Sequence, residues 1–347
     1  MPAARCRATL PGCQPFPAVA HRIETALRDA VAAVLRRRGW TPTVLAYPGY
    51  GADGRARVLG RVLLAPRAAH PEARVAVPGW QRLLTLEAPR TEVQVEVDGA
   101  TRTLCSDDDG LLDAVLELPD DGMDRPRATA VFRAGSRASS APVHLVSPRV
   151  HRAVVCDVDD TVLVTGIGSP LVAAWRTFVQ DPRRRRAVPG MAALLGELTA
   201  GAEPVPVVYL SNGPWNLADP LRRFLERAGF PPGALLLTDW GVQPDRWFRS
   251  GREHKRTSLL RLAEDLPGVR WTLVGDTGEH DPALYEEFAR GHPDRVEAVL
   301  LRDLTLGRGE LVREAVGDVP VLRGRDGREL AAAWPLSPLP GATPRAS

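Results

Sequence analysis

No apolar run in the sequence approaches the ~20 residues that a membrane-spanning helix requires. A signal peptide is not expected either, because prolines interrupt the segment that follows Arg5 and Arg7. Cysteine is scarce and no pair has the spacing of metal ligands, so we expect four reduced thiols: Cys6, Cys13, Cys105 and Cys156. These absences favour a cytoplasmic protein and leave peripheral contact with a membrane open.

An excess of charge of one sign is also missing. The chain has 45 Lys and Arg residues against 42 Asp and Glu residues, which gives a net charge of +3. Nucleic-acid binders usually carry a basic stripe, so we expect no nucleic-acid partner. The length of 347 residues suggests two or three domains, and 44% hydrophobic and 25% charged residues are typical of a folded protein.

Residues 1–40 are expected to form an irregular tail and one amphipathic helix. Between residues 18 and 38 the apolar residues recur at steps of three and four, and Gly39 follows them. We expect this helix to pack against the rest of the protein. A helix that lies on a membrane surface is the alternative.

Residues 41–148 have the pattern of a β-rich domain. Short strand-like segments, among them 57–64, 93–97 and 128–132, are separated by turn residues. Asp98-Gly99 is a hairpin signal, and Tyr-Pro-Gly-Tyr-Gly at residues 47–51 suggests a turn. The segment predicts a small β-sandwich, without a recognisable catalytic constellation.

Residues 149–328 change to an alternation of buried strands and helices. Continuous apolar runs, expected to be strands, occur at residues 153–156, 205–210, 234–237, 271–274 and 296–301. Helical patterns occur at residues 191–198, 217–228, 258–266 and 282–290. This alternation predicts an α/β domain with a parallel sheet wrapped by helices. Residues 329–347 are rich in proline and are predicted to be a disordered tail.

Polar motifs follow three of the predicted strands, where open α/β sheets gather their ligands. Asp157-Val158-Asp159-Asp160-Thr161 follows the first strand, and Ser211-Asn212-Gly213 follows the second. Asp276 and Asp281 lie in the loop after the fourth strand, and Lys255 stands just before a predicted helix. Each motif alone is common. Together, in this order, they indicate one catalytic site.

These residue types suit phosphoryl transfer. Asp157 can attack phosphorus and divide hydrolysis into two easier steps. An anionic nucleophile is repelled by the phosphate, at about 4 kcal/mol per pair of unit charges at ~4 Å and an effective dielectric of ~20. Mg²⁺ held by Asp157 and Asp276, together with Lys255, would offset that repulsion. Asp159 can then act as general acid and base.

Two further carboxylates near these motifs are expected to have minor roles. Asp160 suits a solvated or helix-capping position, and Glu279 suits a loop position that tunes the site.

The amino-acid sequence around the motifs resembles that of one family. CDVDDTVLVTG, YLSNGPWNL and HKRTSLLRLAEDLPGVRWTLVGDTGEHDP are similar to phosphatidate phosphatases of the actin-patch-associated type, within the haloacid dehalogenase (HAD) superfamily. The close resemblance covers residues 150–305. It implies a HAD-like Rossmannoid parallel sheet with a small cap, preceded here by the β-sandwich-like domain and the N-terminal helix.

The resemblance also implies a role for each matched residue. Asp157 would be the nucleophile and Asp159 the acid and base. Mg²⁺ would be held by Asp157, the backbone carbonyl of Asp159, and Asp276, with Asp281 in support. Predicted phosphate-binding residues are Thr161, Ser211, Asn212 and Lys255.

Phosphatidate is the substrate that the resemblance implies. A phosphatase of a soluble phosphomonoester and a non-catalytic phosphatidate-sensing module are the alternatives. Only about 50 residues separate Asp157 from Ser211, too few for a large cap domain. The Arg183–Arg186 run and Trp215 are open to two interpretations: contact with an anionic membrane, or ordinary surface and packing positions.

Overall fold

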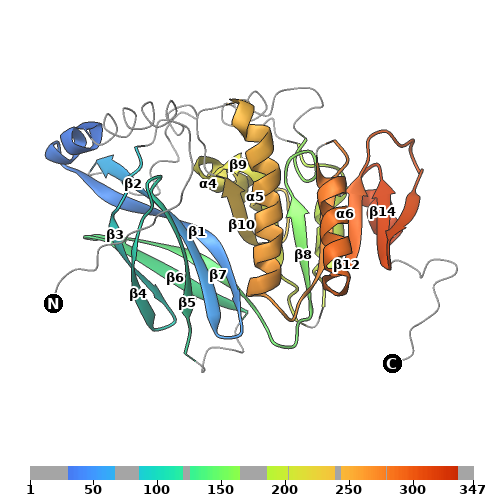
Figure 1. Ribbon diagram of the computed structural model, residues 1–347, viewed down its shortest axis with the longest axis horizontal. Coiled ribbons are helices and arrows are strands. Elements are labelled where there is room, and N and C mark those ends of the chain that lie inside the picture. The colour runs from blue at the N-terminus through green and yellow to red at the C-terminus, as the bar shows by residue number, and fades with distance from the viewer. Residues whose placement is uncertain are drawn as a thin grey trace.

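Two seven-stranded sheets make up most of the protein (Figure 1). The computed structural model describes residues 30–66, 86–119, 126–164, 186–201, 203–238, 244–278 and 280–334. Within the described part of the predicted N-terminal helix, residues 30–37 are helical, and Ala32 and Leu35 pack against the first sheet. Among the described residues no helix has the length and apolar character needed to cross a bilayer.

The first sheet has the strand order β4-β3-β6-β7-β1-β2-β5. Neighbouring strands are antiparallel except β1 and β7, which are parallel. Its strands are β1 (Trp40–Ala52), β2 (Arg55–Pro66), β3 (Glu92–Val97), β4 (Ala100–Cys105), β5 (Leu111–Glu117), β6 (Arg127–Ala134) and β7 (Arg137–Val146).

The first sheet differs from the predicted sandwich, because it is one continuous sheet rather than two packed ones. Its edge strands β4 and β5 approach each other, and Arg102 of β4 donates a hydrogen bond from Nη1 to the carbonyl of Val115 on β5 (3.0 Å). The sheet therefore curls around its own core. In a sequence, short alternating strands are compatible with such a curled sheet as well as with a sandwich, so the pattern does not distinguish the two.

The predicted hairpin turn at Asp98-Gly99 is confirmed, with positive φ at both residues. The turn expected at residues 47–51 is wrong, because these residues lie inside β1. The pairing of β1 with β2 shifts register between Tyr47 and Tyr50, which is a β-bulge. A side chain at Gly49 would collide with the carbonyl of Arg57, so glycine is needed there for close strand approach.

The second sheet has the order β10-β9-β8-β11-β12-β14-β13. Its strands are parallel except for the antiparallel pair β13–β14. From β8 the chain places β9 and β10 on one side and β11 and β12 on the other, so the order reverses at β8. The strands are β8 (Arg152–Asp157), β9 (Val207–Pro214), β10 (Ala234–Thr238), β11 (Arg270–Asp276), β12 (Val296–Arg302), β13 (Val312–Val316) and β14 (Val319–Gly324).

Helices flank the second sheet, and α5 and α6 lie side by side in front of it in Figure 1. The helices are α3 (Met191–Leu198), α4 (Ala218–Arg227), α5 (Pro244–Asp265), α6 (Asp281–Gly291) and α7 (Gly327–Ala332), with short 3₁₀ turns η4 (Trp215–Leu217) and η5 (Pro293–Arg295). Helix α5 starts earlier than predicted, so Lys255 lies inside it. The predicted boundary at residue 328 is also wrong, because it divides α7, whose Leu330 is fully buried.

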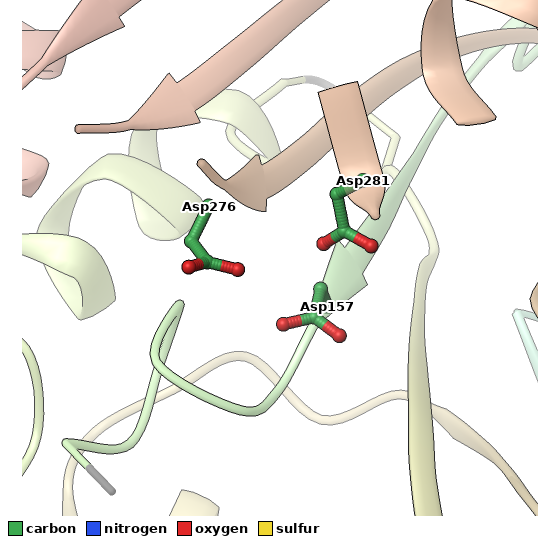
Figure 2. A group of neighbouring side chains, drawn as sticks. All are labelled: Asp157, Asp276 and Asp281. Carbon is green, nitrogen blue, oxygen red and sulfur yellow. The ribbon is translucent and has the colours of Figure 1, made fainter. Parts of the chain in front are cut away.

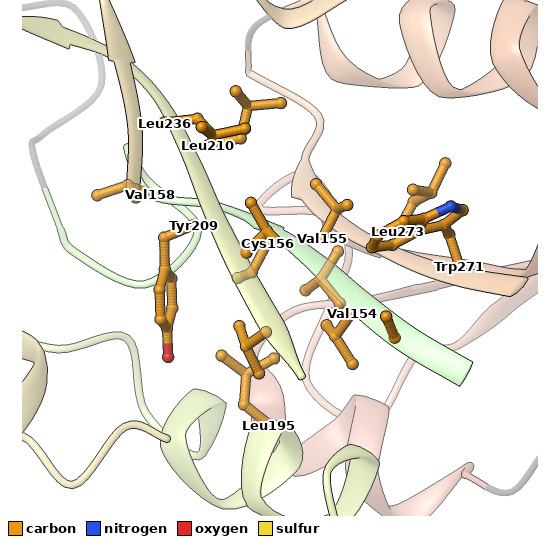
Figure 3. Close-up of a cluster of buried hydrophobic side chains, with 14 of the residues drawn as sticks. Val154, Val155, Cys156, Val158, Leu195, Tyr209, Leu210, Leu236, Trp271 and Leu273 are labelled. Carbon is orange, nitrogen blue, oxygen red and sulfur yellow. The ribbon is translucent and has the colours of Figure 1, made fainter. Parts of the chain in front are cut away.

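The core of the second sheet surrounds β8. Figure 3 shows Val154, Val155 and Cys156 of β8 between residues of β9 and β11. Tyr47 and Leu59 of the first sheet belong to the same buried cluster. The two sheets therefore share part of one hydrophobic core.

A buried histidine in the first sheet predicts pH-dependent stability. Burial, helped by the charge of Arg127, lowers the pKa of His144 from 6.5 to about 4. The unfolded chain therefore binds more protons between these values, and stability falls as the pH drops from 6.5 to 4. His144→Gln should remove ~1.4 kcal/mol per pH unit of that slope in denaturant unfolding. His151→Gln, at an exposed position, is the matched control, and an unchanged slope in His144→Gln would contradict the prediction.

Candidate active site

The candidate site lies at the carboxyl ends of three adjacent strands. Asp157 ends β8, Asp276 ends β11, and Ser211 lies in β9. Because β9, β8 and β11 are parallel neighbours, their polar residues meet at one edge of the sheet. This edge is also the place where the strand order reverses, which is the usual ligand position in open α/β sheets.

Three carboxylates converge at this edge (Figure 2). Asp157, Asp276 and Asp281 each offer an oxygen atom, and these atoms lie within 4.8 Å of one another. The three residues are at most 5% exposed. Asp281 is the first residue of α6, where the helix dipole favours a negative charge.

Lys255 bridges two of these carboxylates from α5. Its Nζ lies 2.7 Å from Asp157 Oδ1 and 2.6 Å from Asp281 Oδ1, and its side chain is only 3% exposed. The buried ammonium group is thus held beside the predicted nucleophile. The structure brings Lys255 together with the predicted nucleophile, and it does so from within a helix rather than from the segment before one.

Asp159 has different surroundings from the other three carboxylates. Ser211 Oγ donates a hydrogen bond to Asp159 Oδ2 (2.8 Å), and Gly213 N donates to Ser211 Oγ (2.9 Å). The Asp159 side chain therefore faces β9. The hydrogen bond fixes its orientation relative to the predicted phosphate-binding loop.

The turn after β8 contains Asp160 in a left-handed conformation, with φ of 55°. Arg302, at the end of β12, donates a hydrogen bond from Nη1 to the Asp160 carbonyl. Arg302 is 7% exposed, and burial lowers its pKa. The hydrogen bond from Arg302 thus holds Asp160 through its backbone. Sequence reasoning missed Arg302, although it lies at the carboxyl end of a parallel strand, which was the signal that identified the other residues.

The two remaining predicted phosphate-binding residues also line this region. Thr161 is fully buried, and its Oγ1 has no hydrogen-bond partner among the described residues. Asn212 lies against α5, where a Cβ at Gly251 would come within 2.9 Å of Asn212 Cγ. Gly251 therefore makes room for the Asn212 side chain.

The charges of this site are unbalanced. Among the described residues of this site, four buried carboxylates (Asp157, Asp159, Asp276 and Asp281) stand against two buried cations, Lys255 and Arg302. Asp281 Oδ2 has no hydrogen-bond partner among the described residues. Uncompensated buried charge is costly, and carboxylate oxygens are the ligands that Mg²⁺ prefers. The donor set therefore fits a hard divalent cation.

Cys156 is next to Asp157 but is poorly suited to compete as a nucleophile. Burial, and then the charges of Asp157 and Asp281, raise the pKa of its thiol well above 9.0. The reactive form of cysteine is the thiolate, so Cys156 stays an unreactive core residue.

Trp215 packs between the two sheets. It is 4% exposed, and its ring stacks on Tyr47 with ring centres 4.6 Å apart. Of the two interpretations of Trp215, the packing position is correct and the membrane contact is wrong.

Some of the predicted features lie outside the described residues. These are the small cap, Glu279, and Arg183 to Arg185. Arg186, the last residue of the arginine run, is described and is exposed.

Gly275 should be essential for the geometry of the carboxylates. A Cβ at this position would lie 2.7 Å from Asp281 Oδ2 and 2.7 Å from Tyr285 Cε2. Gly275→Ala should therefore displace Asp281 and lower kcat/KM for a phosphomonoester by about 10²-fold. Gly291→Ala, whose Cβ would have no neighbour within 4 Å, is the control in α6. Equal rates in the two variants would contradict this role.

The fold and the site together define an α/β domain with a buried carboxylate cluster and a lysine at the switch point of its sheet. Residues 152–303 match the family model described as phosphatidate phosphatase APP1, catalytic domain. The match runs from β8 to the end of β12 and contains every predicted site residue. The first sheet lies outside it.

Two curated proteins from yeasts are similar to this chain. Phosphatidate phosphatase APP1 of Saccharomyces cerevisiae is 27% identical over 162 residues, which are 46% of this chain and 27% of that protein. An uncharacterized protein of Schizosaccharomyces pombe is 26% identical over 155 residues, 44% of this chain and 25% of that protein. The chain thus matches about a quarter of the length of these relatives.

A solved structure with some likeness is a carbohydrate acetylesterase from Xanthomonas citri. It covers 76% of this chain and 68% of its own, at 11% identity and a TM-score of 0.28. A likeness of this size has no bearing on function.

Proposed function

We propose that this protein is a Mg²⁺-dependent phosphatidate phosphatase that hydrolyses phosphatidate to diacylglycerol and phosphate. The observation that carries the proposal is the meeting of Lys255 with the Asp157, Asp276 and Asp281 carboxylates in one buried site. The match of residues 152–303 to the catalytic domain of phosphatidate phosphatases supports the substrate class. The strand order and the Asp-x-Asp-x-Thr motif after β8 support a HAD-like domain.

Asp157 acts as the nucleophile in this proposal. One of its oxygens forms a bond to phosphorus, the bond from phosphorus to the diacylglycerol oxygen breaks, and an acyl phosphate forms. Asp159 supplies the proton that the departing oxygen needs. It then takes a proton from the water that attacks the phosphorus of the acyl phosphate, which releases phosphate and restores Asp157. The hydrogen bond from Ser211 orients Asp159 for this work.

The cations of the site offset the repulsion between Asp157 and the phosphate. Asp157, Asp276 and Asp281 are the side chains that would hold Mg²⁺, and the ion supplies positive charge to the phosphoryl oxygens when bound. Lys255 lies close enough to Asp157 to donate hydrogen bonds to the same oxygens. Ser211, Asn212 and Thr161 complete the proposed phosphate-binding set. Ser211 has one hydroxyl proton, so it donates either to Asp159, as in this structure, or to the phosphoryl group.

Phosphatidate is held in membranes, so this activity requires transient contact between a peripheral protein and a lipid surface. The test is a substrate panel: phosphatidate in mixed micelles and water-soluble phosphomonoesters, each with and without Mg²⁺. We expect kcat/KM to be highest for phosphatidate, and only with Mg²⁺. Equal or faster release of phosphate from a soluble ester would favour the soluble-substrate alternative. Firm binding to phosphatidate liposomes without turnover of any ester would favour a sensing module.

A further inference from the structure

The first sheet contacts the segment that follows the predicted phosphate-binding Ser211. The Tyr47 ring stacks on Trp215 with an angle of 20° between the planes, and Tyr47 OH donates to the Trp215 carbonyl (3.3 Å). Arg61 Nη1 donates to Asn216 Oδ1 (3.1 Å). Trp215 and Asn216 stand four and five residues after Ser211, in the turn η4 that follows β9, so two residues of the first sheet fix the chain directly after this strand.

Arg61 is itself held rigidly by the first sheet. It is 4% exposed, its Nε donates to the Asp109 carbonyl (3.1 Å), and its Nη2 donates to Glu87 Oε1 (3.3 Å). A guanidinium group with several fixed donors has little freedom to follow a moving partner. The hydrogen bond to Asn216 therefore couples the position of η4 to that of the first sheet.

A second contact joins the first sheet to α5, which carries Lys255. Tyr50 OH donates to Asp265 Oδ2 (2.7 Å) and accepts from Arg57 Nη1 (2.6 Å). Arg57 also forms two hydrogen bonds to the Asp113 carboxylate, to which Arg261 of α5 donates as well (3.0 Å).

The electrostatics of this second contact favour a rigid joint. Burial alone would raise the pKa of Asp113, but the hydrogen bonds and charge of Arg57, with those of Arg261, lower it below its ordinary value. Bidentate arginine–carboxylate pairs are among the stronger and more directional hydrogen-bonded pairs. Lys255 precedes Asp265 by ten residues, or ~15 Å of helix, so the joint fixes the helix that presents Lys255.

We propose that the first sheet is a positioning element of the phosphatase site. Tyr47 and Arg61 set the turn η4 that directly follows β9, the strand that holds Ser211, and Tyr50 and Arg57 set the helix that holds Lys255. The shared hydrophobic core supports this role, since Tyr47 and Tyr50 are buried in the cluster of the second sheet. The proposal rests on the proposed function, because it assigns Ser211 and Lys255 to the phosphoryl group.

The test compares Arg61→Met and Asn216→Ala, which remove the hydrogen bond from either side. We expect each to lower kcat/KM about 10-fold, and the double variant to lose no more than either single variant, because the two residues act as one pair. Asn216→Asp keeps an acceptor oxygen for Arg61 and should restore most of the rate. Arg133→Met, which removes an exposed ion pair with Glu96 on the same sheet, is the control.

A second readout separates positioning from stability. Binding of inorganic phosphate in the presence of Mg²⁺, measured calorimetrically well below the unfolding temperature, should weaken about 10-fold in Arg61→Met and stay unchanged in Arg133→Met. Wild-type rates and phosphate affinity in Arg61→Met and Asn216→Ala would overturn the inference while the proposed function stands. A wild-type protein that neither turns over any phosphomonoester nor binds phosphate would overturn both.

Discussion

Asp157→Asn should lose turnover of phosphatidate by a factor on the order of 10⁴ or more, the scale seen when an enzyme loses a nucleophile. An amide cannot form the acyl phosphate, and the substitution also removes a negatively charged oxygen ligand and one of the two carboxylate partners of Lys255. The variant should remain folded, since asparagine has nearly the same volume. Steady-state phosphate release and a thermal unfolding curve measure the two quantities.

Asp160→Asn is the matched control for this prediction. It makes the same chemical change three residues along, outside the carboxylate cluster, and asparagine tolerates the left-handed conformation of Asp160. We expect it to keep most of the wild-type rate. Mass spectrometry of Asp157→Asn must first exclude deamidation back to aspartate. A rate near wild type in the intact amide would then eliminate Asp157 as the nucleophile.

Removal of divalent cations should have the second large effect. A chelator should abolish turnover, and added Mg²⁺ should restore it, because the described carboxylates of the site outnumber its described buried cations. Asp276→Asn removes one carboxylate of the cluster and should require a higher Mg²⁺ concentration for half-maximal rate. Phosphate release at several Mg²⁺ concentrations is the measurement. Full activity in excess chelator would contradict the metal assignment.

Unfolding gives a readout of the same site that does not depend on activity. A ligand that binds only the folded state at 100 times its Kd stabilises it by ~2.7 kcal/mol. Mg²⁺ should therefore raise the unfolding temperature of the wild type, and it should raise the unfolding temperature of Asp276→Asn much less. Asp303→Asn alters another buried carboxylate, which accepts hydrogen bonds from Thr305 and lies outside the cluster. It should retain the Mg²⁺ response.

Much of the second sheet was predictable because its strands are continuously apolar. The pair β13–β14 was not, since β13 is short and exposed at an edge and has no apolar run. Helix α5 was found only in its last part. Its middle is polar, and its buried face there is formed by Gly251 and Lys255, which carry no apolar period.

The candidate site was predictable as a set of strand ends, and its internal arrangement was not. Nothing local in the sequence indicates that the Asp159 carboxylate accepts a hydrogen bond from Ser211 while Asp157, Asp276 and Asp281 face one another. The contact of Arg61 with Asn216 joins residues 155 positions apart, and such pairings depend on how two domains pack. A single sequence carries no periodicity that reports them.

Trapping of the covalent intermediate tests the central claim most directly. The protein should be incubated with phosphatidate and Mg²⁺, quenched, treated with borohydride, and digested for mass spectrometry of the peptide that contains Asp157. Borohydride reduces an acyl phosphate of aspartate to homoserine, so we expect homoserine at position 157, dependent on both substrate and Mg²⁺. Unmodified Asp157 during rapid turnover, or homoserine at another aspartate, would contradict the mechanism.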